Sequence, residues 1–252
     1  SDEKWHDIVN GVDLTLRRGE VMGLIGESGA GKSTLGLAAM GYTQPGCRIK
    51  EGEIKFDGVD LNKLKENEKR KYWGNRMTYV AQSAAASFNP AHRLIKQTTA
   101  SAIRSGFRAV NEAYKDAKEL YRTLNLPDPN NIGDRYPHQV SGGQLQRVMT
   151  AMAMSPRPDL IIFDEPTTAL DVTTQVEVLS SMRAIVEEYN TAAIYITHDL
   201  AVVAQMADFI KVLRYGDEVE EAPTKEMLKN PKEAYTKSLW SVRSLEKEMI
   251  SP

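Results

Sequence analysis

The chain has 252 residues, of which 41% are hydrophobic and 26% are charged, so it can form one large globular domain or two small ones. Its net charge of -2, from 32 basic and 34 acidic residues, gives no general attraction to nucleic acid, so binding through a basic patch is not expected. No apolar run reaches the roughly 18–20 residues that cross a bilayer, and an association with a membrane is therefore expected to go through a partner protein.

The first third of the chain is predicted to be rich in strands. The expected elements are strands at 12–16, 20–25 and 52–56 and a helix at 32–40. Alternating apolar residues mark the first strand as half-buried, and Arg18-Gly19 is expected to turn the chain into the second. Gly41 is a stop signal for the helix, and Asp57-Gly58 predicts a tight turn after the third strand.

A helical block and then an alternating pattern follow. A short strand at 77–80 precedes the block, in which helices are expected at 94–103, 111–124 and 143–154. Strands are then expected at 160–164, 192–197 and 208–213, with helices at 173–189 and 199–206. This alternation predicts parallel strands joined by crossover helices. The tail, 224–246, has a helical pattern with a break at Pro231.

A glycine-rich loop lies between the strand at 20–25 and the following helix. Its pattern, Gly-x-x-x-x-Gly-Lys-Ser, lets the backbone fold tightly so that successive N–H groups point at phosphate oxygens. Lys32 would neutralise the β- and γ-phosphates, and the Ser33 hydroxyl would bind Mg²⁺. The predicted nucleotide-binding residues here are Gly26, Glu27, Ser28, Gly29, Ala30, Gly31, Lys32, Ser33 and Thr34.

Two further segments suggest chemistry at the ends of elements. The apolar strand 160–163 ends in Asp164 and Glu165, and carboxylates at the end of a buried strand are costly unless a cation such as Mg²⁺ awaits them; a solvated strand end is the alternative. His198 follows another strand, at the edge where α/β sheets bind ligands, although an isolated histidine is more often structural.

The helix expected at 143–154 has an unusual start. Ser141 and Gln144 predict a capping box. Gly142 and Gly143 are expected to cost helix propensity without contributing packing, so capping alone does not explain them. Bare amides at a helix N-terminus can approach an anion closely, which predicts a phosphate contact.

In their chain order, these segments together resemble the ATP-binding subunit of ATP-binding-cassette (ABC) transporters, over about residues 9–243. The resemblance implies a Mg-dependent ATPase with ATP and Mg²⁺ as cofactors. It implies an α/β fold, namely a P-loop NTPase ABC cassette with a RecA-like core, an N-terminal antiparallel β portion and an inserted helical subdomain. As a single ABC ATP-binding domain over 1–252, its core would comprise 1–82 and 157–252, and its helical subdomain 83–156.

The resemblance also implies roles for single residues. Asp164 would hold the Mg²⁺ shell, and Glu165 would polarise the attacking water as general base. Gln82 is similar to the family's Q-loop glutamine, which reaches Mg²⁺ and the water, and His198 to its switch histidine, which contacts the γ-phosphate. The implied catalytic residues are Glu165, His198, Gln82 and Lys32, and the implied metal ligands are Ser33, Gln82 and Asp164.

A second subunit is implied by two motifs. Ser141, Gly142, Gly143 and Gln144 resemble the family signature, which closes on the γ-phosphate bound by the opposite subunit; Val140 replaces the usual Leu without affecting those contacts. Asp171 resembles the D-loop aspartate that crosses to the partner, and it could also cap the next helix. The implied partner is a second ABC ATP-binding subunit, in a homodimer or a heterodimer.

One expected part is missing. Family members usually carry an adenine-stacking aromatic on an earlier strand, and this chain is expected to begin after that strand. Trp5, the only aromatic residue before the glycine-rich loop, is either that adenine platform or a surface or hairpin-packing tryptophan.

Several stretches are similar to the oligopeptide, dipeptide and nickel branch of ABC importers, including 87–90, 165–171, 198–203 and 230–236. The implied function is an ATPase subunit that powers import of peptides or related small solutes. It would lie peripherally on the cytoplasmic face of the inner membrane, with transmembrane permease subunits, indirectly an extracytoplasmic solute-binding protein, and no nucleic acid. The alternative is a soluble ABC ATPase of a nucleic-acid, ribosome or metabolic complex.

Overall fold

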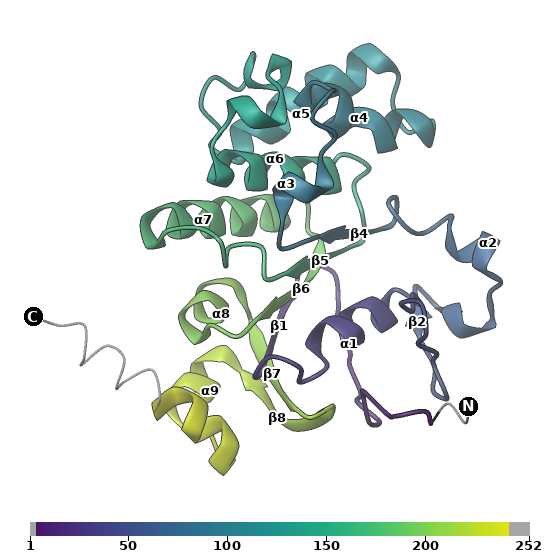
Figure 1. The fold of residues 1–252 in the computed structure, drawn as a ribbon, viewed down its shortest axis with the longest axis vertical. Coiled ribbons are helices and arrows are strands. Elements are labelled where there is room, and N and C mark those ends of the chain that lie inside the picture. Colours follow the sequence, from purple (N-terminus) through teal and green to yellow (C-terminus); the bar gives the residue numbers. More distant parts are fainter. Residues whose placement is uncertain (1–3, 242–252) are drawn as a thin grey trace, which may run out of the picture. The chain divides into compact units, whose positions relative to one another are not determined.

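The computed structural model describes residues 4–241 (Figure 1). These residues divide into two compact units. The first, here the phosphate-loop unit, combines residues up to Leu16, Val21–Asn62 and the chain from Tyr195 onward. The second, here the helical unit, combines Arg17–Glu20 and Lys63–Ile194. The predicted helical subdomain, 83–156, lies wholly within the helical unit, and its predicted limits stay a prediction.

Buried strands organise the phosphate-loop unit. Its β1 (Val21–Ile25) pairs in parallel with β7 (Phe209–Arg214), and β7 pairs in antiparallel with β8 (Asp217–Pro223). All five residues of β1 are buried. Helix α8 (Leu200–Met206) packs closely on β1, because a Cβ atom at Gly23 would lie only 2.0 Å from Cγ2 of Val203.

The antiparallel strand β8 was not predicted. Its acidic sequence is typical of an exposed loop, but Glu218 and Glu221 each place a carboxylate oxygen 2.7 Å from Nζ of Lys211, which is fully buried on β7. Two carboxylates therefore neutralise the buried ammonium group, so the charge of Lys211 is not left buried without a partner beside the β7–β8 ladder.

The remaining elements of this unit are α1 (Lys32–Ala39), β2 (Lys55–Phe56), β3 (Val59–Asp60), the 3₁₀ helix η1 (Leu61–Lys63) and α9 (Thr224–Lys229), followed after a break by helical residues 234–241. They follow the sequence pattern in part: the strand expected at 52–56 is shorter, at Lys55–Phe56, and β3 and η1 were not predicted. The expected turn between β2 and β3 is confirmed, since Asp57 and Gly58 both have positive φ, as a type I′ hairpin turn requires. The break at Pro231 is confirmed, and the part of the predicted tail beyond residue 241 lies outside the described residues.

The strand expected at 12–16 is wrong. The side chains there do alternate between half-buried and exposed, but within the described residues this segment belongs to no strand. Alternation reports which side chains are sheltered, whereas a strand also requires a neighbouring backbone to pair with.

Helices dominate the helical unit, as expected. Strands β4 (Met77–Val80) and β5 (Leu160–Asp164) pair in parallel, and β6 (Ala192–Thr197) spans the boundary between the units along the chain. The helices are α2 (Glu66–Lys69), α3 (Ala84–Ser87), α4 (Leu94–Arg104), α5 (Val110–Thr123), α6 (Gly142–Met154) and α7 (Val172–Glu188), with 3₁₀ helices η2 (Ile132–Asp134) and η3 (Pro137–Gln139). Helix α6 is central, because it packs against α3, α4, α5, α7 and β4 (Figure 1).

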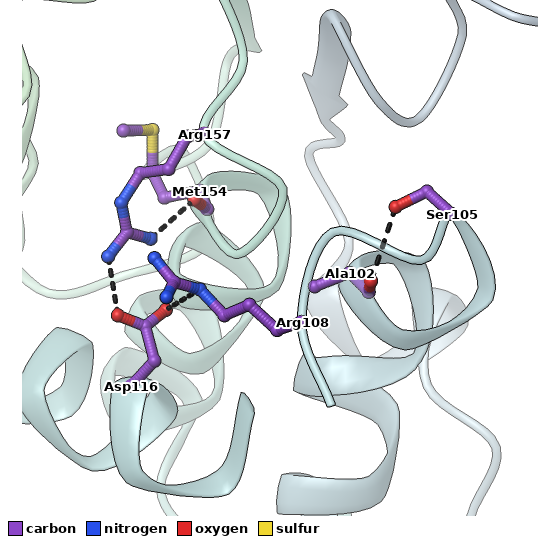
Figure 2. A network of polar contacts seen from close by, with 6 residues as sticks. All are labelled: Ala102, Ser105, Arg108, Asp116, Met154 and Arg157. Atoms are coloured by element: carbon purple, nitrogen blue, oxygen red, sulfur yellow. Dashed lines mark hydrogen bonds and ion pairs between the residues drawn. The ribbon is translucent and has the colours of Figure 1, made fainter. Parts of the chain in front are cut away.

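In the helical unit, a polar network links α5 to the segment between α4 and α5 and to the segment between α6 and β5. Figure 2 shows the guanidinium groups of Arg108 and Arg157 directed at the carboxylate of Asp116. Nη2 of Arg157 lies 2.6 Å from Oδ1, and Nε of Arg108 lies 3.5 Å from Oδ2. Arg157 also donates to the backbone carbonyl of Met154 at 3.0 Å, and its guanidinium lies 4.1 Å from the ring centroid of Tyr189. The Asp116 carboxylate thus links α5 to the segment before it through Arg108, and to the segment after α6 through Arg157.

Candidate active site

The glycine-rich loop follows β1 and closes on the lysine that begins α1. The ammonium group of Lys32, which is 5% exposed, donates to the carbonyl of Gly26 at 2.6 Å and to that of Glu27 at 2.9 Å. Gly31 has a φ of 92° and provides no side-chain cap for α1. The first amides of α1 are therefore not capped by a side chain, which is the arrangement that binds phosphate.

The hairpin between β7 and β8 supports this loop. The amide of Gly216 donates to the carbonyl of Ala30 at 3.0 Å. A Cβ atom at Gly26 would lie 2.2 Å from the carbonyl oxygen of Leu213, so only glycine permits the loop to pass so close to β7.

Sequence reasoning missed a second support, which comes from the C-terminal helical residues. The hydroxyl of Tyr235 accepts a hydrogen bond from the amide of Glu27 at 3.3 Å. The guanidinium of Arg214 lies 4.7 Å from the ring centroid of Tyr235 and 5.2 Å from that of Tyr215. Burial raises the pKa of the Tyr235 hydroxyl above its ordinary value. The sequence predicts a helical pattern in the tail, but it contains no signal that Tyr235 contacts the phosphate loop.

The other predicted residues of this unit lie at element ends. Ser33 and Thr34 are in the first turn of α1. His198 is exposed directly after β6, between Thr197, whose hydroxyl accepts from the Asp199 amide at 3.0 Å, and Asp199, which caps α8 by accepting from the amide of Ala201 at 2.8 Å. These hydrogen bonds hold the backbone on both sides of His198 at the carboxyl end of a buried strand.

In the helical unit, two carboxylates mark the end of β5. Asp164 accepts a hydrogen bond from the hydroxyl of Tyr79 on β4, a contact that sequence reasoning did not foresee. Burial, together with this carboxylate, raises the pKa of the Tyr79 hydroxyl well above its ordinary value. Glu165 has a φ of 46°, a left-handed conformation that is uncommon for a residue other than glycine. Its carboxylate accepts from the hydroxyl of Thr168 at 3.1 Å, and such backbone strain clusters at functional sites.

Gln82 is exposed two residues after the end of β4. The backbone just before it is held from α6, since the side chain of Gln146 donates to the carbonyl of Ala81 at 3.2 Å. Gln146 is 3% exposed and was not among the predicted site residues. This hydrogen bond links the segment that carries Gln82 to the helix that begins at the predicted signature.

The capping box at the start of α6 is confirmed. The Gln144 amide donates to the Ser141 hydroxyl at 3.2 Å, and the Ser141 amide donates to the Gln144 side chain at 3.1 Å. The expectation that neither glycine serves packing is wrong for Gly143, because a Cβ atom there would lie 2.3 Å from Cγ2 of Thr174 on α7. A Cβ atom at Gly142 would meet only the Leu170 side chain at 3.6 Å, an ordinary contact.

Asp171 caps α7, as the alternative for this residue predicted. Its carboxylate accepts from the Thr174 amide at 3.0 Å and from the Thr174 hydroxyl at 2.7 Å. These hydrogen bonds lower the pKa of Asp171 below its ordinary value. Because Gly143 packs on the same threonine, the predicted signature and the predicted D-loop are neighbours within the helical unit. The contact of Asp171 with a partner subunit stays a prediction.

Trp5 is 56% exposed, and the guanidinium of Arg48 lies 4.1 Å from its ring centroid. One face of the indole is therefore already covered by a cation. Its role as an adenine platform stays a prediction.

The donors available for a metal fit Mg²⁺. Among residues 4–241, no group of three or more His, Cys, Asp or Glu side chains could hold a metal ion. Mg²⁺ does not require such a cage, because it prefers oxygen ligands and is held by one or two protein groups together with substrate phosphates. Ser33 in the phosphate-loop unit, and Gln82 and Asp164 in the helical unit, each carry an oxygen of the kind that Mg²⁺ prefers, and their role as its ligands stays a prediction.

This combination of a glycine-rich phosphate loop, strand-end carboxylates and a capped glycine pair defines a P-loop nucleotide-binding protein. Residues 9–168 match the family model described as ABC transporter. The chain is 40% identical over 232 residues to the oligopeptide transport ATP-binding protein AppD of Bacillus subtilis (strain 168), covering 92% of this chain and 71% of that protein. It is 37% identical over 243 residues to the metal-staphylopine import system ATP-binding protein CntD of Staphylococcus aureus (strain Mu50), covering 96% of this chain and 89% of that protein.

Solved structures agree. The fold matches the dimeric structure of MJ0796, a bacterial ABC transporter cassette, with a TM-score of 0.75 at 27% identity, covering 89% of this chain and 94% of that one. It also matches the post-hydrolysis state of that cassette bound to ADP and phosphate, with a TM-score of 0.73. The chain belongs to the ABC transporter family, and the predicted cassette fold and ATPase activity are confirmed. Within the described part of the chain, no helix is both long and apolar enough to span a bilayer.

Proposed function

We propose that this chain binds and hydrolyses ATP to power an importer of peptides or related small solutes. The observation that carries the proposal is its 40% identity, over 92% of its length, to an oligopeptide transport ATP-binding protein. A dipeptide transport ATP-binding protein, DppD of Haemophilus influenzae, is equally similar, at 40% identity over 238 residues, covering 94% of this chain and 71% of that protein.

The phosphate-loop residues would bind the nucleotide. Lys32 would exchange its hydrogen bonds to the carbonyls of Gly26 and Glu27 for bonds to the β- and γ-phosphates, and the uncapped first amides of α1 would add further donors. Ser33, Gln82 and Asp164 would hold Mg²⁺, which when bound neutralises charge on the phosphates.

Hydrolysis would then depend on two side chains that lie at strand ends. Glu165 would polarise the attacking water as general base, and its bond from Thr168 supports this by restraining the carboxylate. His198 would contact the γ-phosphate and orient the water from the end of β6.

The signature would serve the nucleotide of a second ABC subunit. Ser141 and Gln144 already satisfy each other in the capping box, and a Cβ atom at Gly142 would meet only the Leu170 side chain, at 3.6 Å. The two glycines would therefore let backbone amides approach a γ-phosphate closely. Asp171 would reach toward the same partner.

The cassette would attach peripherally to transmembrane permease subunits at the cytoplasmic face of the inner membrane. An extracytoplasmic solute-binding protein would take part indirectly, and no nucleic acid would be bound. The rival function is that of a soluble ABC ATPase in a nucleic-acid, ribosome or metabolic complex, and no specific observation favours it.

Affinity purification of the tagged chain from its native host tests the proposal. We expect integral membrane proteins to copurify from detergent-solubilised membranes, together with ATPase activity. Recovery with ribosomes, nucleic acid or a soluble enzyme complex, and without a membrane protein, would overturn the importer assignment. A control purification of Lys32→Ala separates partners that require bound nucleotide from those that do not.

A further inference from the structure

A tyrosine on the neighbouring strand contacts the carboxylate proposed to hold the metal. The hydroxyl of Tyr79 donates to Oδ2 of Asp164, and both residues belong to the helical unit. Tyr79 is half-buried, so its hydroxyl has only restricted access to water and gains from a protein acceptor.

The pairing of the strands explains why these two side chains meet. In the parallel ladder of β4 and β5, Tyr79 lies opposite Ile162. Asp164 is two residues further along β5, so its side chain is on the same face of the sheet as that of Ile162. Tyr79 and Asp164 are therefore diagonal neighbours, which is within the reach of a tyrosine. The contact follows from strand register and does not depend on a loop conformation.

We propose that Tyr79 is a positioning residue for the metal-binding carboxylate, holding one oxygen of Asp164 so that the other faces the Mg²⁺ shell of MgATP. This inference rests on the proposed metal role of Asp164. A carboxylate has two oxygens with several acceptor sites between them, and a fixed donor on one oxygen limits rotation of the group. Tyr79 itself would touch neither nucleotide nor metal.

A purely structural role makes a different prediction. If Tyr79 serves only to satisfy its own hydroxyl, its removal lowers the stability of the protein and leaves the dependence on Mg²⁺ unchanged. If Tyr79 positions Asp164, ATP affinity without metal stays constant and the contribution of Mg²⁺ decreases. The two roles are therefore separated by a metal titration and not by activity alone.

The test uses Tyr79→Phe in the full-length purified chain. Calorimetry measures the affinity for ATP in EDTA and in Mg²⁺, and a Mg²⁺ titration measures ATPase activity. We expect unchanged affinity in EDTA, a loss of about three- to tenfold in the affinity gained from Mg²⁺, and a matching rise in the Mg²⁺ concentration for half-maximal activity. Activity should recover at saturating Mg²⁺. Tyr79→Met, which also lacks a donor, replaces the Phe variant if that variant does not fold.

Two matched controls lie in the same unit. Thr78→Val removes a hydroxyl from the adjacent residue of β4, one that has no hydrogen-bond partner among residues 4–241. Tyr121→Phe removes a fully buried tyrosine hydroxyl whose partner, 2.6 Å away, is the Thr98 hydroxyl. We expect Tyr121→Phe to lower the unfolding temperature, and neither control to change the dependence on Mg²⁺.

The outcomes separate this inference from the proposed function. If Asp164→Asn raises the Mg²⁺ requirement and Tyr79→Phe does not, the positioning role is wrong and the metal role of Asp164 remains. Equal losses with and without Mg²⁺ in Tyr79→Phe would also overturn the positioning role. If Asp164→Asn leaves the Mg²⁺ requirement unchanged, the proposed metal site is wrong, and the inference is wrong with it.

Discussion

At the scale of single residues, one candidate site residue in each unit is held by hydrogen bonds within that unit. Glu165 has a left-handed backbone and a hydrogen bond from Thr168, while Lys32 is buried against two carbonyls of its own loop. The Glu165 carboxylate is thus restrained in advance, which lowers the cost of reorganisation when it acts on water. Lys32, by contrast, has to exchange its two carbonyl partners for phosphate oxygens.

Glu165→Gln should separate binding from hydrolysis. The amide keeps the size and the acceptor oxygen of the carboxylate but cannot act as a base, so we expect ATP affinity to stay within about twofold and the turnover number to fall by about 100-fold or more. Thr168→Val, which removes only the hydrogen bond to Glu165, is the matched control and should cost much less. Steady-state ATPase assays and calorimetry measure both quantities, and near-normal turnover of Glu165→Gln would contradict the general-base role.

At the scale of elements, the two neighbouring glycines at the start of α6 are present for different physical reasons. Gly143 is required by the close approach of α6 and α7, whereas a Cβ atom at Gly142 would make only an ordinary contact with Leu170. The capping pattern and the glycines could be recognised from the sequence. The helix contact at Gly143 could not, because it depends on which helices pack together.

The pair Gly142→Asp and Gly143→Ala tests this difference. Gly142→Asp should keep the fold and lower ATPase activity by about 100-fold or more. The reason is that a negatively charged carboxylate would stand where backbone amides are expected to approach a phosphate. Gly143→Ala should lower the free energy of unfolding by about 1–3 kcal/mol through its clash with Thr174. Adding Thr174→Ser removes the clashing methyl and keeps the hydroxyl that bonds Asp171, so it should restore stability. Thermal unfolding measures the stability of the variants, and ATPase assays measure their activity. If Gly142→Asp destabilises the protein as much as Gly143→Ala does, the two glycines do not differ in their roles.

The Asp116 network makes a prediction for the helical unit alone. Asp116→Ala would leave two partly buried arginines facing each other without a counter-charge (Figure 2), so we expect the free energy of unfolding to fall by about 2–4 kcal/mol. Glu119→Ala is the matched control, because this residue of α5 pairs with Arg122 at the surface and should cost less than about 1 kcal/mol. Denaturant unfolding measures both, and equal effects would show that the network contributes no more than a surface pair.

Most elements could be predicted because their side-chain periodicity reports burial directly. Short elements such as β3 and α2 carry too few residues for a pattern, and the other differences share one cause, namely a partner that is distant in the sequence. The acidic strand β8 depends on the buried Lys211, residues 12–16 have the alternation without a strand to pair with, and the Tyr79 contact depends on the register of β4 against β5. The motif residues were recognisable because phosphate binding fixes their spacing, whereas their supporting contacts are set by tertiary packing.

At the scale of the whole molecule, the surface of α7 next to Asp171 indicates where a second subunit would bind. Val172 is 76% exposed and Val176 is 49% exposed, four residues apart on one side of the helix. They follow directly on the predicted D-loop, and the MJ0796 cassette that shares this fold was solved as a dimer. Apolar side chains at this position are therefore expected to become covered when two ATP-bound subunits associate.

The dimer should form only with ATP and should require this surface. In Glu165→Gln, where hydrolysis is slow, ATP and Mg²⁺ should shift the chain from monomer to dimer in sedimentation velocity, while ADP should not. Adding Val172→Glu should prevent the shift, because two charges would be buried against apolar or like-charged surface. Val110→Glu is the control, because Val110 is also an exposed valine, 51% exposed, and lies on α5. This variant should still shift from monomer to dimer with ATP and Mg²⁺. In the wild-type chain, specific ATPase activity should rise with protein concentration. A rate that is independent of concentration and unaffected by Val172→Glu would mean that one subunit hydrolyses ATP alone and that the signature serves no partner.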